Sequence, residues 1–555
     1  MIGLLAFAMV ATGYAFVARS GCSGMTAVTL VSAPDQSTIL STLAERWQET
    51  KPSVNGRCVR LDVSSKDSAQ VVDAMSPAWD SKQDGPRPDI WAPESSTWVT
   101  LARGRPDTRD LLPPVSPPLA RSPIVVAMPR PMAVAIGWPN LQLGWMELLN
   151  KVSDDQRGWA ASGHPEWGRL RMGVADPGRD TAALAALSAL VNYDGDNDLS
   201  DTELVGAFKL EHAVSIFVPT TEQLFQGLAK ADAAGTALQY VSAFPATERD
   251  VIQYNSTNPR VPLDAVYPPE GAPSADHPFV VLHASWVDSL RRAAAAQLLA
   301  FINSPKSVQA YVDEGFRPPD GRATAMITEA HGFLTAGGTD RPPEDAGILL
   351  KVIATWTAMR RAGNALTVVD TSRSMAKRVP GTDKTRLEIA QQAAVGVLQL
   401  LKPDSNLALW SFASQRHELV PLGPVAKQRG PFEKQLGGLK PGGGSALYET
   451  TLAAYERTLA DWQPNRLNVI ILLCDGRDEE RNGLSRTQLV AELTRIRDPK
   501  KPIQLAAIAY GPDADVGALR AITAAVDGRT YLSDNPTDLP SVLLSAIVGV
   551  NAASG

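Results

Sequence analysis

Hydroxyl and carboxylate side chains stand at the carboxyl ends of apolar segments in the second half of the sequence. The segment ALTVVDTSRSM contains Asp370, Ser372 and Ser374. Ser445 follows three glycines just before a helical stretch, and Asp475 ends the most apolar segment, NVIILLCD. Oxygen ligands of these kinds suit a hard divalent cation such as Mg²⁺ or Mn²⁺, since Mg²⁺ takes about six oxygens in an octahedron and readily keeps some as water.

These side chains converge only if the apolar segments are neighbouring parallel strands. From about residue 363 the sequence alternates strand-like segments with helical stretches; the strand-like segments are ALTVVD, NLALWSF, LNVIILLCD, IQLAAIAYG and RTYLS. The alternation predicts an α/β fold with a doubly wound, Rossmann-like sheet whose functional loops lie at its carboxyl edge.

The order of these motifs closely resembles the metal-ion-dependent adhesion site of the von Willebrand factor A family. The resemblance implies that three hydroxyls bind the metal directly and that two carboxylates hold it directly or through water: Ser372, Ser374, Ser445, Asp370 and Asp475. It also implies that an acidic side chain of a protein partner completes the coordination. This sequence has Arg373 where the family usually has glycine, and Ser445 where it usually has threonine.

Other interpretations of the same residues remain open. Asp370 would, without a metal, cap the turn that follows it, with the serines solvating that turn. A bound metal can also polarise a phosphate or carbonyl group, so a Mg²⁺-dependent hydrolase is an alternative. The sequence has no P-loop, no Gly-x-Ser-x-Gly elbow and no paired His and Cys. We therefore expect binding and not catalysis.

The first half of the sequence shows a second α/β pattern. Strand-like and helical segments alternate as strand, helix, strand, helix, strand from AVTLVSAP to PDIWAPESSTWV, which predicts a parallel sheet. The succession of Pro-Asp-Ile-Trp, Ala-Asp-Pro-x-x-Asp-Thr, Tyr-Pro-Pro-Glu-Gly and Gly-Phe-Arg resembles type II periplasmic-type solute-binding proteins. That resemblance implies two lobes that close on an anion or a small polar solute.

Four polar loop residues are candidates for the solute cleft: Ser95, Ser96, Thr181 and Asn255. Oxyanion-binding relatives often have serine after the Asp-Pro turn, whereas this sequence has Asp180, which would repel an anion. The alternative is that these residues only cap helices. The module would then serve protein contact.

The sequence divides into four predicted parts. They are a signal or membrane-anchor segment, a two-lobed solute-binding-like domain, a linker with a connecting helix, and a von Willebrand factor A domain: 1–21, 22–334, 335–362 and 363–555. The linker is predicted from the Gly- and Pro-rich stretch TAGGTDRPPEDAG.

The N-terminal segment points to the cell envelope. Residues 2–17 carry no charge, which is typical of a secretory segment or a short membrane anchor, because a full span needs about 20 apolar residues. No basic residue precedes the segment, so we expect the natural start to lie upstream. Ser20-Gly21-Cys22 resembles the end of a bacterial lipoprotein cleavage box, although Arg19 departs from it. A Cys22–Cys58 disulfide is the favoured alternative to lipidation or a free thiol.

An acidic loop, NYDGDNDLSDTE, offers a second cation-binding candidate. Read as a twelve-residue calcium loop, it places these residues among the Ca²⁺ ligands: Asn192, Asp194, Asp196, Asp198 and Glu203. The competing interpretation is a solvated loop that caps the next helix.

The composition argues against nucleic acid as a partner, because the net charge is −6 and no basic face is implied. We expect an extracytoplasmic, membrane-anchored or secreted protein that binds a protein partner through a metal-held acidic side chain, with a small solute as a further ligand. The alternative is a transport-type solute receptor whose second domain only tethers it to envelope proteins.

Overall fold

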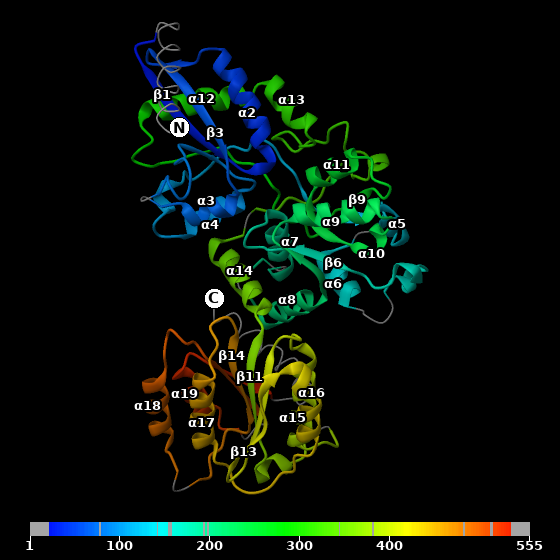
Figure 1. Ribbon diagram of the computed structural model, residues 1–555, viewed down its shortest axis with the longest axis vertical. Coiled ribbons are helices and arrows are strands. Elements are labelled where there is room, and N and C mark those ends of the chain that lie inside the picture. The colour runs from blue at the N-terminus through cyan, green and yellow to red at the C-terminus, as the bar shows by residue number, and fades with distance from the viewer. Residues whose placement is uncertain are drawn as a thin grey trace. The chain divides into compact units, whose positions relative to one another are not determined.

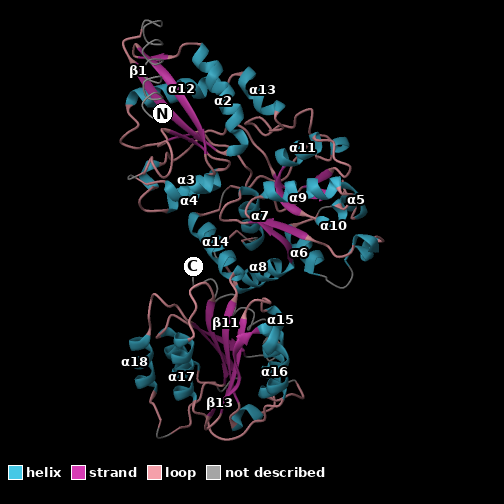
Figure 2. Cartoon of the chain, viewed as in Figure 1, coloured by secondary structure: helices cyan, strands magenta, loops and turns pink. Residues whose placement is uncertain are grey.

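The computed structural model describes most of the chain. Outside the described residues lie the predicted signal or anchor segment and several shorter stretches: 1–21, 77–78, 141–142, 154–157, 193–194, 197–198, 343, 380–381, 481–482, 511–513 and 534–555. The described residues form two compact units. Unit 1 comprises Met1–Asp198 and Ala213–Ile353, and unit 2 comprises Leu199–His212 and Ala354–Gly555. Strands and helices alternate in both (Figures 1 and 2), which confirms the predicted α/β class.

The first lobe of unit 1 is built on a five-stranded sheet. Its strands, in spatial order, are β10 (Val280–Val281), β4 (Ile90–Ala92), β1 (Met25–Ser32), β3 (Arg57–Ser65) and β2 (Ser53–Val54). β4, β1 and β3 are parallel, as predicted, and the short outer strands are antiparallel. The helices of this part are α2 (Pro34–Glu49), α3 (Ser68–Ala74), α4 (Ser96–Gly104), α12 (Ser289–Ile302) and α13 (Pro305–Asp313). Apolar residues of α2, α12 and the central strands form one core.

The second lobe of unit 1 has its own core and two small sheets. The sheets are β8 (Phe244–Thr247), β5 (Ile124–Pro129) and β9 (Leu263–Val266), which are antiparallel, and the parallel pair β6 (Met172–Ala175) and β7 (Val214–Val218). The helices are α5 (Arg130–Ala135), α6 (Trp145–Ser153), α7 (Thr181–Val191), α9 (Thr221–Ala233), α10 (Ala237–Tyr240) and α11 (Glu248–Ser256). The second core draws on β5, β8, β9, α9 and α11.

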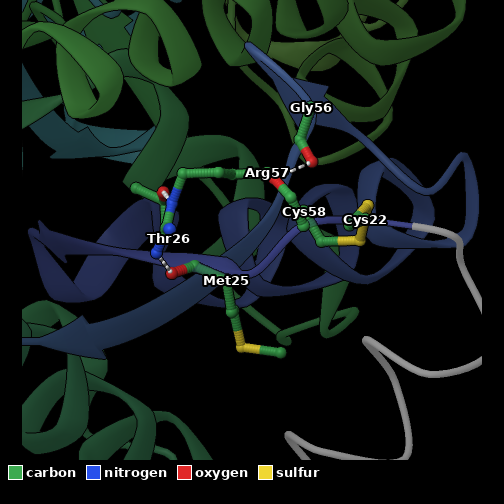
Figure 3. The surroundings of a disulfide bond; sticks show 7 residues. Cys22, Met25, Thr26, Gly56, Arg57 and Cys58 are labelled. Atoms are coloured by element: carbon green, nitrogen blue, oxygen red, sulfur yellow. Dashed lines mark hydrogen bonds between the residues drawn. A yellow bond between two sulfur atoms is a disulfide. The ribbon is translucent and has the colours of Figure 1, made fainter.

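A disulfide fastens the start of the first lobe. Cys22 and Cys58, the pair favoured from the sequence, are joined in the structure, and Cys58 is the register partner of Met25 across the β1–β3 pair (Figure 3). Arg57 supports the same corner, donating hydrogen bonds to the Met25 carbonyl at 2.5 Å and to the Thr26 hydroxyl at 3.2 Å. The covalent link and the guanidinium therefore hold the N-terminal end of β1.

Unit 2 is a six-stranded sheet covered by helices on both faces. The strand order is β13 (Arg416–Pro424), β12 (Asn406–Phe412), β11 (Gly363–Asp370), β14 (Leu467–Cys474), β15 (Gln504–Tyr510) and β16 (Arg529–Ser533). All neighbours are parallel except β13, an antiparallel edge strand that the sequence analysis did not predict. Most residues of β13 are exposed, and Pro421, Gly423 and Pro424 interrupt its apolar residues, so its sequence lacks the continuous apolar run of a central strand.

The strict alternation of side chains along a strand assigns the two faces of this sheet. Ala365 and Val369 of β11 join the core under α15 (Arg386–Leu400) and α16 (Val425–Gly437). Leu366 and Val368 join the other core, under α17 (Leu447–Ala460), α18 (Arg486–Ile496) and α19 (Val516–Ala524). Figure 1 shows the two groups of helices on opposite sides of the sheet. β11 is consequently buried on both faces.

The division between the units falls inside α14 (Ala346–Arg360), between Ile353 and Ala354. Unit 2 also includes most of α8 (Asp201–Ala213), whose buried Glu211 accepts hydrogen bonds from Arg360 at 3.1 Å and Lys402 at 2.8 Å. Among the residues that the structure describes, no helix combines the length and the hydropathy needed to cross a membrane.

A buried ion pair in unit 1 leads to a stability prediction. Arg317 donates hydrogen bonds to Glu248 at 2.8 and 2.7 Å, and the Tyr267 hydroxyl donates to the same carboxylate; the Arg317 and Glu248 side chains are 4% and 1% exposed. Arg317→Met would leave a buried carboxylate without its cation, so we expect the free energy of unfolding to fall by about 3–5 kcal/mol in urea titrations.

The matched control is Arg322→Met, because Arg322 pairs with Asp320 while 69% exposed. It should change the free energy of unfolding by less than about 0.5 kcal/mol. Equal effects of the two substitutions would contradict the importance assigned to the buried pair.

Candidate functional site

Three loops meet at the carboxyl edge of the unit 2 sheet. Asp370 is the last residue of β11, and Asp475 directly follows β14, its parallel neighbour. The glycine-rich loop is hydrogen-bonded to the loop after β11, since Gly442 donates its backbone N–H to the Thr371 carbonyl at 2.8 Å and Arg373 donates to the Gly443 carbonyl at 3.1 Å. These backbone contacts bring Ser445 to the edge that carries the carboxylates.

Three oxygen atoms at this edge are buried without a hydrogen-bond partner among the described residues. They are Oδ2 of Asp370, Oγ of Ser445 and Oδ1 of Asp475, on side chains that are 0–3% exposed. A buried polar atom without a partner costs about 1–3 kcal/mol. Oγ of Ser372 and Oγ of Ser374 lie 2.9 Å apart beside them. Two carboxylates and three hydroxyls, with three atoms unsatisfied, fit a hard divalent cation.

The environment of Asp370 is compatible with a bound cation. One of its oxygens accepts the Ser372 backbone N–H at 2.7 Å, so the turn-capping interpretation accounts for Oδ1 but not for Oδ2. Burial, reinforced by the charges of Asp475 and Glu479, raises the pKa of Asp370 to about 7 against the opposing effect of the Ser372 hydrogen bonds. A metal ligand must be ionised. A bound cation would supply the charge that stabilises the ionised form.

The backbone turn after Asp475 fixes the position of this residue. Gly476 has a φ of +80°, and a Cβ atom there would lie 3.0 Å from the Asp515 carbonyl oxygen, so the turn needs glycine. The Asp515 backbone N–H donates to the Asp475 carbonyl at 3.2 Å.

Arg386 is a residue of this site that the sequence analysis missed. Its Nη1 lies 3.4 Å from Oδ2 of Asp475, and both side chains are buried. The two residues are 89 positions apart in the sequence, so no local motif could connect them. The side chain of Arg373, which stands where the family usually has glycine, is exposed.

The structure separates the predicted solute-site residues into two groups. Thr181 begins α7, where its hydroxyl donates to Glu94 and accepts the indole N–H of Trp98 at 2.8 Å. Ser95 caps α4, and the adjacent Ser96 donates from its backbone N–H and its hydroxyl to Asp276, both at 2.6 Å.

Asn255 is hydrogen-bonded to the backbone at the start of β9. Its amide donates to the Leu263 carbonyl at 2.8 Å and accepts the Leu263 backbone N–H at 2.9 Å. The side chain thereby closes the connection between α11 and β9. Both of its polar atoms are engaged with the backbone.

Four carboxylates of unit 1 lie close enough to influence one another's pKa. All are at or near the first turn of a helix: Asp35 (α2), Glu94 (α4), Asp180 (α7) and Asp250 (α11). Burial, with added repulsion from the other three, raises the pKa of Glu94 well above its usual range. Burial also raises the pKa of Asp180 and of Asp250.

Two basic side chains face this carboxylate group. Burial tends to raise the pKa of Asp35, but His277, whose Nε2 lies 2.6 Å from Oδ2, outweighs it and brings the pKa below its usual value. The guanidinium of Arg249 lies 3.2 Å from Asp250. Among the described residues, these carboxylates therefore outnumber the two basic groups. The sequence analysis had pointed only to Asp180, as a residue that would repel an anion.

The acidic loop of the calcium hypothesis is only partly described. Asn192 donates its amide to Glu344 at 2.6 Å, and Glu203 accepts from the Ser200 backbone N–H and hydroxyl at 2.9 and 2.8 Å, next to the start of α8. Asp196 is exposed, while Asp194 and Asp198 lie outside the described residues. Calcium binding stays a prediction. Among all the residues that the structure describes, no group of three or more His, Cys, Asp or Glu side chains is arranged to hold a metal, and the candidate site at the edge of the unit 2 sheet, with two carboxylates, is not such a group.

Comparisons with known families match both halves of the chain. Residues 28–317 match the family described as bacterial extracellular solute-binding protein. Residues 365–477 match the von Willebrand factor type A domain, and this range contains all five residues of the candidate metal site. An uncharacterized protein of Mycobacterium tuberculosis is 23% identical over 520 residues, which are 92% of this chain and 74% of that protein.

Solved structures of both kinds are similar to parts of the chain. A periplasmic thiamin binding protein has 13% identity and a TM-score of 0.42, covering 60% of this chain and 96% of that one. An iron-bound protein, HitA from Pseudomonas aeruginosa, has 16% identity and a TM-score of 0.39, covering 60% and 99%. A von Willebrand factor type A protein from Catenulispora acidiphila has 18% identity and a TM-score of 0.29, covering 34% of this chain and 43% of that one.

The raised pKa of Glu94 predicts a pH-dependent loss of stability. Below the pKa of the unfolded chain, both states carry a protonated Glu94 and folding is not penalised. As the pH rises toward the higher pKa of the folded state, the unfolded state ionises first and the folded state loses stability. Glu94→Gln removes this effect, so between about pH 4 and about pH 8 the variant should lose less stability than the wild type.

Urea unfolding at both pH values measures this difference. Glu222→Gln, at an exposed position of α9, is the matched control and should follow the wild type. Parallel pH profiles for wild type and Glu94→Gln would show that Glu94 titrates normally in the folded chain.

Proposed function

Since the chain belongs to the bacterial extracellular solute-binding protein family through residues 28–317 and has a von Willebrand factor type A domain after it, we propose that it is an extracytoplasmic binding protein with a metal-dependent adhesion site. The domain boundaries near residues 334 and 362 and an N-terminal membrane anchor within residues 1–21 are parts of this proposal. The charge-free segment 2–17 supports the anchor.

The buried, unpartnered oxygens of Asp370, Ser445 and Asp475 are the observation that carries the proposed metal site. These three residues, with Ser372 and Ser374, would hold Mg²⁺ or Mn²⁺. A bound metal would supply a Lewis acid able to attract an anionic oxygen. The hydroxyls keep the site poor in negative charge, because only two of the five side chains are carboxylates. An acidic side chain of a protein partner is therefore the ligand that the site suits best.

A binding role explains the residues at this edge better than catalysis does. Two further charged groups act on the proposed ligands: Arg386, which pairs with Asp475, and Glu479, whose charge acts on Asp370. Glu479 is exposed, and Arg386 is buried and ion-paired. Neither arrangement resembles a general base held within hydrogen-bond reach of a nucleophile.

The first module supports a second proposed activity, recognition of a small solute. The observation in its favour is the excess of carboxylates among the side chains at the starts of α2, α4, α7 and α11. An excess of buried carboxyl groups disfavours an anion, and a bound cation would favour their ionised form, which burial alone disfavours. We propose a small cationic solute, with Thr181, Ser96 and Trp98 as further polar or aromatic contacts.

Titration calorimetry tests the metal site. We expect the purified chain to bind Mg²⁺ and Mn²⁺, and the Ser372→Ala/Ser374→Ala variant and Asp370→Asn to lose at least about 100-fold in affinity, because each removes oxygens from an already minimal ligand set. Asp404→Asn is the control, since Asp404 is an exposed carboxylate just before the start of β12, at the opposite end of the strands.

Retention of wild-type affinity in Asp370→Asn would refute the metal site. If metal binds, the same variants should lose capture of the partner. Binding of the chain to a surface that carries immobilised acidic peptides measures that step. Peptides with the matching amide side chains in place of the acids are the control.

Thermal denaturation tests the solute proposal. In the Ser372→Ala/Ser374→Ala background, which removes metal binding from unit 2, small polyamines or divalent cations should raise the melting temperature of the chain, whereas sulfate should not. Glu94→Gln/Asp250→Asn should abolish the shift. Stabilisation by sulfate and not by cations would reverse the proposed charge preference.

A further inference from the structure

A buried guanidinium lies against one of the proposed metal ligands. Nη1 of Arg386 is 3.4 Å from Oδ2 of Asp475, with side chains 7% and 3% exposed. A buried Arg–Asp pair is expensive to break on one side, because the remaining charge is then left uncompensated in a medium of low polarity. Asp475 consequently has a cationic partner even when no metal is considered.

Local structure positions Arg386 independently of the metal. It is the first residue of α15, and Thr385 caps this helix in a capping box in which Thr385 and Glu388 satisfy each other's backbone N–H groups. The Arg386 backbone N–H also donates to the Lys377 carbonyl at 3.0 Å, which ties it to the segment after the Ser372 and Ser374 loop. The helix cap and the backbone hydrogen bonds therefore fix the position of Arg386 at the site.

The guanidinium occupies one oxygen of Asp475 and leaves the other. Oδ2 faces Arg386, whereas Oδ1 is buried and has no hydrogen-bond partner among the described residues. A bidentate arginine–carboxylate pair would use both oxygens. The single contact leaves Oδ1 for the cation, so Asp475 can be shared between guanidinium and metal.

Resting on the proposed metal-dependent function, we propose that Arg386 is a resident counter-charge that weakens metal binding and thereby couples the metal to an acidic ligand. With Asp370 and Asp475 ionised, as metal ligands must be, the two carboxylates and Arg386 sum to −1. A divalent cation changes this sum to +1, and the carboxylate of a partner returns it to zero. Glu479 adds negative charge nearby, but its side chain is exposed and water screens it.

Two consequences distinguish this arrangement from a merely structural ion pair. Metal alone should bind weakly, because it enters beside a fixed positive charge. Metal and carboxylate should bind cooperatively, because each removes the charge imbalance that the other creates. A purely structural arginine would stabilise the fold without altering either property.

Titration calorimetry of Mg²⁺ and Mn²⁺ into the whole chain tests the inference with Arg386→Gln and Arg386→Lys. Glutamine removes the charge and lysine keeps it. We expect Arg386→Gln to bind metal at least about tenfold more tightly than the wild type, and Arg386→Lys to stay within about threefold of it. Thermal denaturation without metal should show Arg386→Gln to be the least stable and to gain the largest shift from Mg²⁺.

A comparison of the Mg²⁺ affinity of the wild type in two salts tests the inference even if the variants do not fold. Replacing chloride by acetate at equal ionic strength should raise the Mg²⁺ affinity of the wild type, and should raise it less in Arg386→Gln. An unchanged Mg²⁺ affinity of the wild type in acetate would overturn the inference.

The outcomes separate this inference from the function on which it rests. If the wild type binds metal and Arg386→Gln binds it no more tightly, the counter-charge role is wrong while the metal site stands. Equal tightening by glutamine and lysine would also overturn it, because charge would not be the cause. If neither the wild type nor Arg386→Gln binds metal, the proposed metal site and the inference both fail.

Discussion

A carboxylate that is removed from water must be neutralised, paired or hydrogen-bonded, and the protein meets this requirement in a different way at each of its buried acids. Glu248 receives two hydrogen bonds from a buried guanidinium, and this pair joins segments of unit 1 that are 69 residues apart. Asp370 receives one backbone N–H and keeps a free oxygen. The fully paired acid stabilises the framework, whereas the unpartnered oxygen of Asp370 supports the proposed metal site.

Packing of the unit 2 sheet holds the unpartnered oxygens in place. β11 and β14 contribute side chains to apolar cores on both faces, so their carboxyl ends cannot move to let Asp370 or Asp475 reach solvent. Hydrogen bonds between the glycine-rich loop and the loop after β11 hold the hydroxyls in register with them. Packing energy from the whole sheet therefore maintains a small group of unsatisfied oxygens, which is the preorganisation that a metal site requires.

In the proposed functions both modules would bind a positively charged group, but its further partners would differ. In unit 1 the carboxylates Asp35, Glu94, Asp180 and Asp250 exceed the basic groups facing them, His277 and Arg249. In unit 2 the site has fewer acids, more hydroxyls and a buried arginine of its own. The unit 1 carboxylates would bind a cation as the ligand itself. The unit 2 site would bind a metal cation, which would then bind an acidic group of a partner. One chain would thus combine recognition of a cationic solute with adhesion to an acidic surface.

The sequence by itself determined the α/β class of both halves, the parallel order of β1, β3 and β4, and the motif residues from Asp370 to Asp475, because apolar periodicity and strand-end motifs are local features. It also favoured the Cys22–Cys58 pair, since few cysteines were available. Only the tertiary structure decided that Arg386 faces Asp475, that Glu94 lies among other acids, and that Asn255 serves the backbone. Those relations join residues far apart in the sequence. The edge strand β13 was also not predicted, because its sequence has no continuous apolar run. Burial and electrostatic neighbourhood depend on the packed chain, so no local pattern could reveal them.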